Sequence, residues 1–216
     1  MAAQIIIEPR IDRIALSSVP HDTVTLARWL IGKVLVSQVR GAQLTGRIVE
    51  TEAYLQREAA CHAFRGMTPR NRSLFLEHGH AYVYLCYGTS LMLNISSEPA
   101  GVGSGVLLRA LQPLSGIEHM RRGREHVRRA DLARGPGRLA AAMRINKNHD
   151  GLNLFNGAKL WIGSDGFEVA EQQIGISVRI GLTKAADEHL RFFLAASPYL
   201  SGSRTLNAWP APSPAT

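Results

Sequence analysis

The stretch KVLVSQVRGAQLTGRIVETEAY, residues 33–54, predicts the centre of the fold. Residues 33–39 are rich in β-branched and apolar side chains and predict a strand, and residues 44–54 predict its antiparallel partner. Arg40 and Gly41, which lie between them, predict the turn of a hairpin. The sequence therefore predicts an antiparallel sheet that is organised around this hairpin.

Helix signals lie on both sides of the hairpin. Asp22 predicts the N-cap of a helix that runs to about residue 31, where Gly32 predicts its end. Thr68 and Pro69 form a cap followed by a proline at the first helical position, which predicts a short helix over residues 69–77. Two more helices are expected, a basic one over residues 115–129 and one that opens at Gly135-Pro136-Gly137 and runs through Met143.

Strands outnumber these helices and mostly follow one another without crossover connections, which favours an antiparallel sheet. The expected fold is therefore α+β, a single domain in which short helices surround a curved, mixed but mostly antiparallel β-sheet. The further strands are expected at residues 81–85, 91–96, 105–111, 159–162, 175–182 and 190–194.

The chain length fits one large domain better than two. The chain has 216 residues, of which 45% are hydrophobic, and this is enough for a sizeable core. We expect an N-terminal extension over residues 1–20, a main domain over residues 21–205 and a tail over residues 206–216. The tail is expected to be disordered because its end, residues 210–216, is rich in Pro, Ala and Ser.

The net charge of the chain is +8 and its pI is near 10.1, an excess that is typical of proteins that bind a polyanion. The charge alone does not decide whether the partner is a nucleic acid, because many soluble proteins are basic. The chain lacks the run of 18 apolar residues that would predict a membrane span, and residues 1–7 lack the basic start of a signal peptide. The two cysteines, Cys61 and Cys86, have no framework of spacings and suit a reducing cytosol.

Two carboxylates mark the end of the second hairpin strand. Side chains alternate along a strand, so Glu50, Glu52 and Tyr54 are expected to share one face. Two carboxylates on one face raise each other's pKa, which would tune one of them as a general base. The alternative is a solvated edge of the sheet.

Tyrosines gather in the same part of the sequence: Tyr54, Tyr82, Tyr84 and Tyr87 are four of the five in the chain. Tyr82 and Tyr84 are expected on one strand face, which fits either core packing or the wall of an aromatic pocket. Tyr87 precedes Gly88 in an expected turn, and a turn that exposes it would suit insertion into a duplex. A carboxylate beside an aromatic slot is a plausible arrangement for holding a flat base.

Two other kinds of site compete with this interpretation. Residues 61–86 contain several metal-binding residue types, but their spacing matches no common zinc pattern, so no metal and no other cofactor is expected. A noncatalytic nucleic-acid-binding module is the second alternative, based on the basic residues 120–129 and the tyrosines. Glu52 distinguishes a hydrolase from a binding module. A hydrolase needs a carboxylate at this position, whereas in a binding module the carboxylate would only repel phosphate. The metal-binding residue types are Cys61, His62, His78, His80 and Cys86.

An ordered series of stretches spread over about residues 26–200 resembles the alkyladenine (3-methyladenine) DNA glycosylases of the vertebrate-and-bacterial type, which differ in fold from the helix-hairpin-helix glycosylases. The resemblance implies a monofunctional enzyme that flips alkylated or deaminated purines out of double-stranded DNA and hydrolyses their glycosidic bond. It implies a monomer that acts near the nucleoid in a bacterial cytoplasm or in a eukaryotic nucleus. The stretches are GRIVETEAY, TPRNRSLF, YVYLCYG, LNISS, VLLRALQPL, GPGRL, INK and RIGLTKAADEHLRFFLAASPY.

The resemblance also implies roles for individual residues. Glu52 matches the general base that activates water for attack on the deoxyribose C1′, Arg109 matches an arginine that helps to hold this water, and the main-chain carbonyl of Ile180 matches a further water contact. Asn94 matches an asparagine that obstructs the 2-amino group of normal guanine. Tyr87 matches the tyrosine that fills the hole left by the flipped nucleotide. The remaining matches are the aromatic walls Tyr54, His62 and Tyr84, and the DNA-proximal positions Thr68, Arg124, Gly135, Pro136 and Arg138.

Physical chemistry supports this assignment. A base must leave the stack before it can be excised, so a stacking pocket and an intercalating side chain are both expected. Alkylation at N3 or N7 makes a purine cationic, and a cation between electron-rich rings gains about 0.5–2 kcal/mol. Arg109 stays protonated and so cannot be the base. No lysine occupies a matched pocket position, so a Schiff base is unexpected and a bare abasic site is the expected product.

Overall fold

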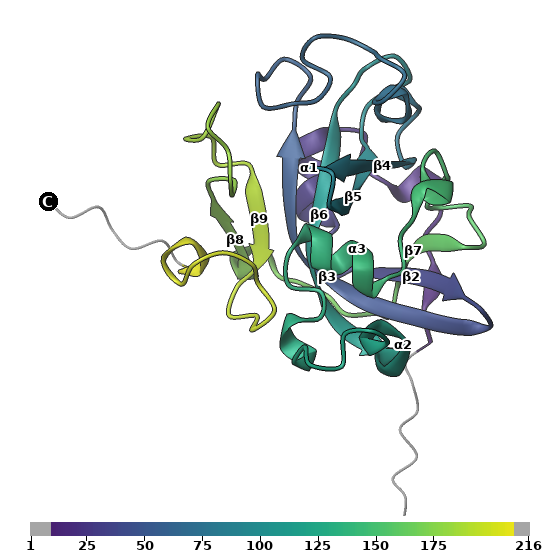
Figure 1. The fold of residues 1–216 in the computed structure, drawn as a ribbon. Helices are drawn as coiled ribbons and strands as arrows, with labels where there is room; N and C mark the ends of the chain where they lie inside the picture. Colours follow the sequence, from purple (N-terminus) through teal and green to yellow (C-terminus); the bar gives the residue numbers. More distant parts are fainter. Residues whose placement is uncertain (1–9, 210–216) are drawn as a thin grey trace, which may run out of the picture.

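The predicted hairpin of residues 33–54 lies at the centre of the sheet. In the computed structural model, which describes residues 10–209, strands β2 (Val34–Val39) and β3 (Ala42–Tyr54) pair antiparallel (Figure 1). The turn residues Arg40 and Gly41 have φ angles of 47° and 79°, a turn geometry that follows the twist of the two strands. The prediction of this hairpin is confirmed.

Nine strands form one sheet, and every strand pair among the described residues is antiparallel. The main path through the sheet runs β1-β7-β2-β3-β6-β5-β4, and β9 joins β8 to β3. The expected α+β fold is confirmed, and each expected strand overlaps an observed one. The remaining strands are β1 (Asp12–Arg13), β4 (Ala81–Cys86), β5 (Ser90–Ser96), β6 (Gly105–Ser115), β7 (Leu160–Ser164), β8 (Ile174–Ser177) and β9 (Arg191–Leu194).

Strand β3 changes its neighbour in the middle of its length. Residues 42–47 pair with β2 and Glu50 to Glu52 pair with β9, while β6 pairs along the other edge from Thr45 to Tyr54. The register with β6 shifts on both sides of Glu50, which marks a β-bulge. Bulges bend a strand and re-aim its side chains. The two candidate carboxylates therefore lie where the sheet forks.

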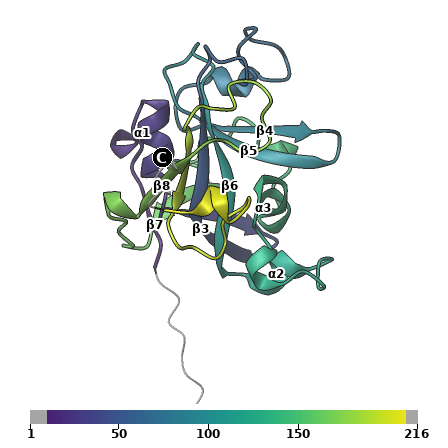
Figure 2. The ribbon, with the colours of Figure 1, turned by 90° about the vertical axis from the view of Figure 1, so that its left-hand side faces the viewer.

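Helices α1 (Thr23–Trp29) and α3 (Pro136–Ala142) lie on opposite sides of the sheet (Figure 2). Asp22 caps α1 as predicted, since its side chain accepts a hydrogen bond from the Thr25 backbone N–H at 2.8 Å. Helix α3 begins at Pro136, as predicted, after a Gly135 whose φ of 112° favours glycine. The main hydrophobic core fills the space between the sheet and these helices.

Three predicted elements are shorter than expected. Residues 69–77 form only a 3₁₀ turn at Arg72–Phe75, because Asn71 accepts hydrogen bonds from Thr68 and ties up the residue expected to cap a helix. The basic helix of residues 115–129 shrinks to α2 (Ile117–Arg121). Gly123, which follows it, has a φ of 77°, and the repelling arginines around it disfavour a longer helix. The strand expected at residues 175–182 ends at Ser177.

The ends of the chain are partly described. Residues 12–13, within the expected N-terminal extension, pair with β7, and Val19 is buried in the core. Residues 1–9 and the end of the expected tail, residues 210–216, lie outside the described residues. Within residues 10–209, no helix has the length and apolar character needed to cross a membrane.

Candidate active site

A pocket of about 390 Å³ lies beside the end of β3 and is formed by β3, β4, β5, β6, the start of α3 and the segment after β8. Its volume is in the range of sites for small ligands. The pocket brings together eight of the predicted site residues from distant parts of the chain. These are Tyr54, His62, Tyr84, Tyr87, Asn94, Arg109, Pro136 and Ile180.

Aromatic rings form one wall of the pocket. The rings of Tyr82 and Tyr84 stack with their centroids 5.4 Å apart, and His62 meets the Tyr84 ring edge-on at 4.4 Å. Burial raises the pKa of both tyrosines, so they stay protonated. Burial and the charge of Arg70 lower the pKa of His62, so its imidazole is neutral near pH 7. The wall is uncharged and can stack on a cationic base without repulsion.

Asn94 lies on β5 opposite Tyr82 and is buried at the pocket. Its Nδ2 donates a hydrogen bond to the Tyr82 carbonyl at 3.3 Å. This bond to the backbone restricts rotation of the amide group. A rigid amide in the pocket is suited to reading the edge of a base, because a group that it cannot pair with is left unsatisfied.

Tyr87 is at the tip of the β4–β5 hairpin, where its φ is 48° and that of Gly88 is 71°. This residue is 93% exposed, and it also lines the pocket. The turn therefore presents Tyr87 as expected for a side chain that enters a duplex.

Glu52 is fully buried, and its carboxylate accepts three hydrogen bonds. The Ile180 backbone N–H donates to Oε1 at 2.7 Å, while the Tyr54 hydroxyl and Arg109 Nη1 donate to Oε2 at 2.9 and 3.1 Å. All three donor residues line the pocket, so the carboxylate lies directly behind its wall. A carboxylate has about four acceptor positions. One position on Oε1 is thus left for a further donor.

The second carboxylate, Glu50, serves a different purpose. It is fully buried and accepts hydrogen bonds from Arg191 Nε, Arg109 Nε, and the Ser201 N–H and hydroxyl, at 2.6–3.1 Å. Burial would raise the pKa of Glu50, but the charges of Arg191 and Arg109 outweigh it and the pKa is lowered. The expectation of a mutually raised pKa is therefore wrong for Glu50, which stays ionised.

Arg109 joins the two carboxylates. It donates Nε to Glu50 and Nη1 to Glu52, and it also donates to the Ser201 hydroxyl. Burial would lower the pKa of Arg109, but Glu52 and Glu50 outweigh this effect and raise it. Arg109 is thus a fixed positive charge whose position depends on both glutamates, and the sharing of one face by Glu50 and Glu52 is confirmed.

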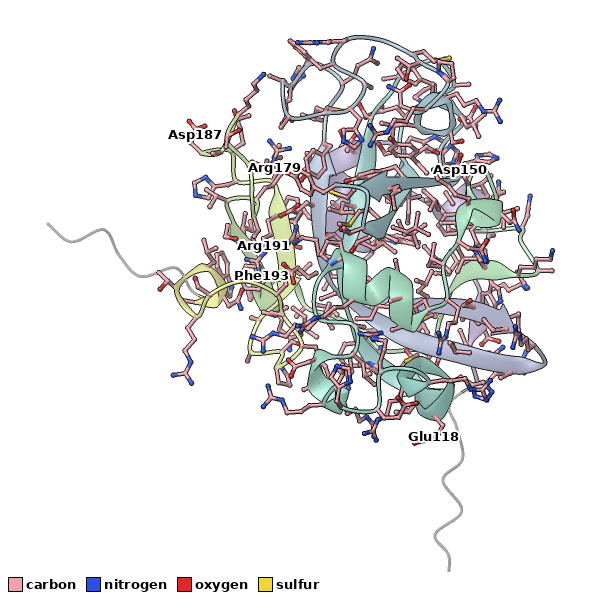
Figure 3. All side chains as sticks on the ribbon, viewed as in Figure 1. Glu118, Asp150, Arg179, Asp187, Arg191 and Phe193 are labelled. Atoms are coloured by element: carbon pink, nitrogen blue, oxygen red, sulfur yellow. The ribbon has the colours of Figure 1, made fainter. Side chains whose placement is uncertain are left out.

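Two buried arginines of this site were not predicted from the sequence, Arg179 and Arg191, and both lie on the side of β3 where β8 and β9 run (Figure 3). Arg191 donates to Glu50 and to four groups of the chain from Ser177 to Asn207. A signal for it exists in the sequence, since a charged residue inside the apolar stretch LRFFL must find a partner on burial.

Arg179 holds the Tyr54 side of the pocket. It donates to the Ala53 carbonyl at 2.7 Å, forms an ion pair with Glu58, and lies over the Tyr54 ring at 4.7 Å. Burial and the charge of Glu52 raise the pKa of Tyr54, so its hydroxyl remains a donor to Glu52. The early end of β8 explains this arrangement, because residues after Ser177 turn toward β3 and place Ile180 at Glu52.

Of the predicted DNA-proximal residues, Pro136 and Tyr87 line the pocket. Arg124 donates to the carbonyls of Leu132 and Arg138 at 2.7 and 3.4 Å, beside α3. The start of α3 packs against β5, where Gly137 lies against Ser90. The other predicted positions, Thr68, Gly135 and Arg138, lie in the surface loop before β4 and at the start of α3.

Two other features are separate from this pocket. A cavity of about 440 Å³ is lined by Arg40, Arg122, Arg144 and Lys159 among others, and it contains none of the predicted site residues. Of the metal-binding residue types considered in the sequence, the structure places only His78 in a group close enough to share an ion among the described residues, together with His21 and Glu77.

Comparisons with known proteins agree with this geometry. Residues 17–198 match the family model described as methylpurine-DNA glycosylase. A protein of Mesorhizobium japonicum, provisionally named a 3-methyladenine DNA glycosylase, is 58% identical over 193 residues, which cover 89% of this chain and 92% of that protein. Two further relatives have the same provisional name. The protein of Paraburkholderia phytofirmans is 48% identical, over 88% of this chain and 89% of its own length. The protein of Chlorobaculum parvum is 44% identical, over 84% of this chain and 87% of its own length. The chain therefore belongs to the methylpurine-DNA glycosylase family and is an N-glycosyl hydrolase that acts on damaged DNA.

Proposed function

We propose that this protein is a monofunctional glycosylase that excises 3-methyladenine and related purines, including 7-methylguanine, hypoxanthine and ethenoadenine, from duplex DNA. The observation that carries this proposal is the ionisable Glu52 carboxylate behind the wall of an uncharged aromatic pocket. The pocket accounts for selection of flat bases, and the carboxylate accounts for hydrolysis. The provisional names of the relatives agree with 3-methyladenine as one substrate.

The reaction begins with a flipped base stacked against Tyr84 and His62. A cationic alkylated purine is favoured there by about 0.5–2 kcal/mol through its attraction to the electron-rich rings. Its positive charge also weakens the glycosidic bond, so the protein needs mainly to stabilise an oxocarbenium-like sugar and to supply water. The negative charge of Glu52 does the first, and its unused acceptor position on Oε1 takes the proton from water. Arg109 orients the water and Glu52 without exchanging a proton.

The product is a bare abasic site. Among the described residues that line the pocket, the nitrogen-bearing side chains are His62, Asn94 and Arg109, and none is a primary amine. A Schiff base with the sugar would need such an amine. Water is thus the nucleophile, and the strand stays intact after excision.

The DNA contacts the face that carries the pocket mouth. We place Tyr87 in the gap left by the flipped nucleotide and the positive charges of Arg124 and Arg138 along the phosphates. Thr68, Gly135 and Pro136 border the same face. The protein acts as a monomer in the compartment that holds the DNA.

A product assay tests the proposal against the noncatalytic binding module. Duplex oligonucleotides, each with one lesion, are incubated with the protein and then analysed with and without alkali. The expected result is strand cleavage only after alkali, with release of the free base, and no release from an undamaged duplex. Binding to the lesion duplex without base release would favour the binding module. Cleavage without alkali would show lyase chemistry.

A further inference from the structure

Two histidines and a glutamate form a cluster that takes no part in the pocket. His21 precedes helix α1, and Glu77 and His78 lie before β4, more than fifty residues later in the chain. One candidate ligand atom from each of the three side chains lies within 4.8 Å of the other two. The centroids of the two imidazole rings are only 3.9 Å apart.

The hydrogen bonds of the cluster are incomplete. His78 is 5% exposed, and its Nδ1 lies 3.0 Å from Glu77 Oε1. Within the part of the chain that the structure describes, its buried Nε2 has no hydrogen-bond partner. A buried polar atom without a partner costs about 1–3 kcal/mol. Two imidazoles in contact beside a carboxylate supply the nitrogen and oxygen donors that zinc binds.

We propose that His21, Glu77 and His78 bind a divalent transition-metal ion of the zinc class. Imidazole nitrogen and carboxylate oxygen are ordinary zinc ligands, with bonds of about 2.0–2.2 Å that place neighbouring ligand atoms roughly 3.3 Å apart in a tetrahedron. The three ligand atoms already lie within 4.8 Å of one another, so binding would require the exposed side chains of His21 and Glu77 to rotate toward the ion. Water fills the fourth position.

The ion would connect two parts of the fold. Asp22 and Thr23, which follow His21, begin helix α1, and Thr23 is held by Glu98 through a 2.7 Å hydrogen bond. Glu77 and His78 lead into β4, the strand that carries Tyr82 and Tyr84. A bound ion would fix the start of α1 to the entry of this strand. Its role is structural, because the three ligands share no residue with the pocket lining.

Zinc titration of the untagged, metal-free protein tests the proposal. Binding is measured by calorimetry, and the melting temperature is compared with Zn²⁺, with Mg²⁺ and with a chelator. We expect one zinc per chain and a melting temperature raised by Zn²⁺ but not by Mg²⁺. His21→Ala and Glu77→Gln should each weaken zinc binding by more than about tenfold. Both residues are exposed, so neither variant should change the melting temperature in chelator.

His126→Ala is the matched control, since His126 is an exposed histidine outside the group. It should bind zinc as the wild type does. Excision of lesions by His21→Ala should equal that of the wild type, which separates this site from the catalytic one. The proposal is overturned if no saturable zinc binding is observed, or if His21→Ala and Glu77→Gln bind zinc as tightly as His126→Ala.

Discussion

Replacing Glu52 with glutamine removes one negative charge and leaves the shape of the side chain nearly unchanged. Loss of a general base costs about 10²–10⁴-fold in rate. This corresponds to about 3–5 kcal/mol of transition-state stabilisation. Affinity for a lesion duplex should stay close to wild type, because Tyr84, His62 and the other pocket walls are intact. The loss should therefore appear in single-turnover excision and not in binding.

The hydrogen bonds of Glu52 also set a cost in stability. All three of its protein partners are donors, two at Oε2 and the Ile180 N–H at Oε1. A glutamine that keeps its oxygen toward Tyr54 and Arg109 must turn its NH₂ group toward the Ile180 N–H. Such a donor-to-donor contact costs about 1–3 kcal/mol. Glu52→Gln should accordingly have a lower melting temperature than the wild type, but it should still be folded at the temperature of the assay.

Glu50→Gln is the matched control, because Glu50 lies on the same strand and also binds Arg109. This change leaves Arg191 with no carboxylate, and breaking a buried ion pair costs about 3–5 kcal/mol of stability. We expect Glu50→Gln to lose more stability and less activity than Glu52→Gln, when both are assayed at a temperature where they are folded. Single-turnover excision by Glu52→Gln within a few-fold of wild type would refute the assignment and indicate Glu50 as the base.

Three further substitutions and the acid dependence of unfolding test other parts of the site. Tyr87→Ala should weaken binding to damaged duplex by about 1–3 kcal/mol, with a smaller loss of excision from single-stranded substrate; equal losses on both would contradict intercalation. Asn94→Ala should raise release of guanine relative to hypoxanthine, and an unchanged ratio would count against its role. Ser201→Ala should slow excision with little change in duplex affinity, compared with the exposed Ser203→Ala as control. The pKa of Glu50 is held below its ordinary value of 4.5, so its charge stabilises the fold above about pH 4.5 and this stability is lost as the pH falls; Glu50→Gln should flatten that acid dependence of unfolding.

Local patterns explain which parts of the fold were predictable. The hairpin of residues 33–54 is encoded by alternation and by a turn that suits Arg40 and Gly41. The cap at Asp22 and the proline start of α3 are likewise local signals. The shared face of Tyr82 and Tyr84 followed from the period of two along β4, whereas their place beside a pocket came from the resemblance to the family. Each of these features depends on neighbours within a few residues.

The features that were not predicted from the sequence depend on contacts between residues that are far apart in the chain. The short length of β8 cannot be read from its sequence, because the chain leaves the sheet to place Arg179 and Ile180 at β3. The resemblance supplied Glu52 and Arg109 but not the partners that fix them. Arg191 carries a weak sequence signal, a charge in an apolar strand, which indicates burial but does not identify Glu50 as the partner. Only the folded chain brings these residues together.

Residues 201–207, near the C-terminus, take part in the network of ion pairs and hydrogen bonds around Glu50 and Arg109. The family match ends at residue 198, yet Ser201 supplies two of the hydrogen bonds to Glu50 and also contacts Arg109. Two buried glutamates and two buried arginines balance in charge, but balance alone does not fix geometry, which requires that every donor and acceptor be satisfied. Residues 201–207 supply the remaining partners. Ser201 bonds to Glu50 and Arg109, and the oxygen atoms of Ser201, Leu206 and Asn207 accept hydrogen bonds from Arg191. The position of Arg109, and through it the orientation of Glu52, therefore depends on a segment that does not itself line the pocket.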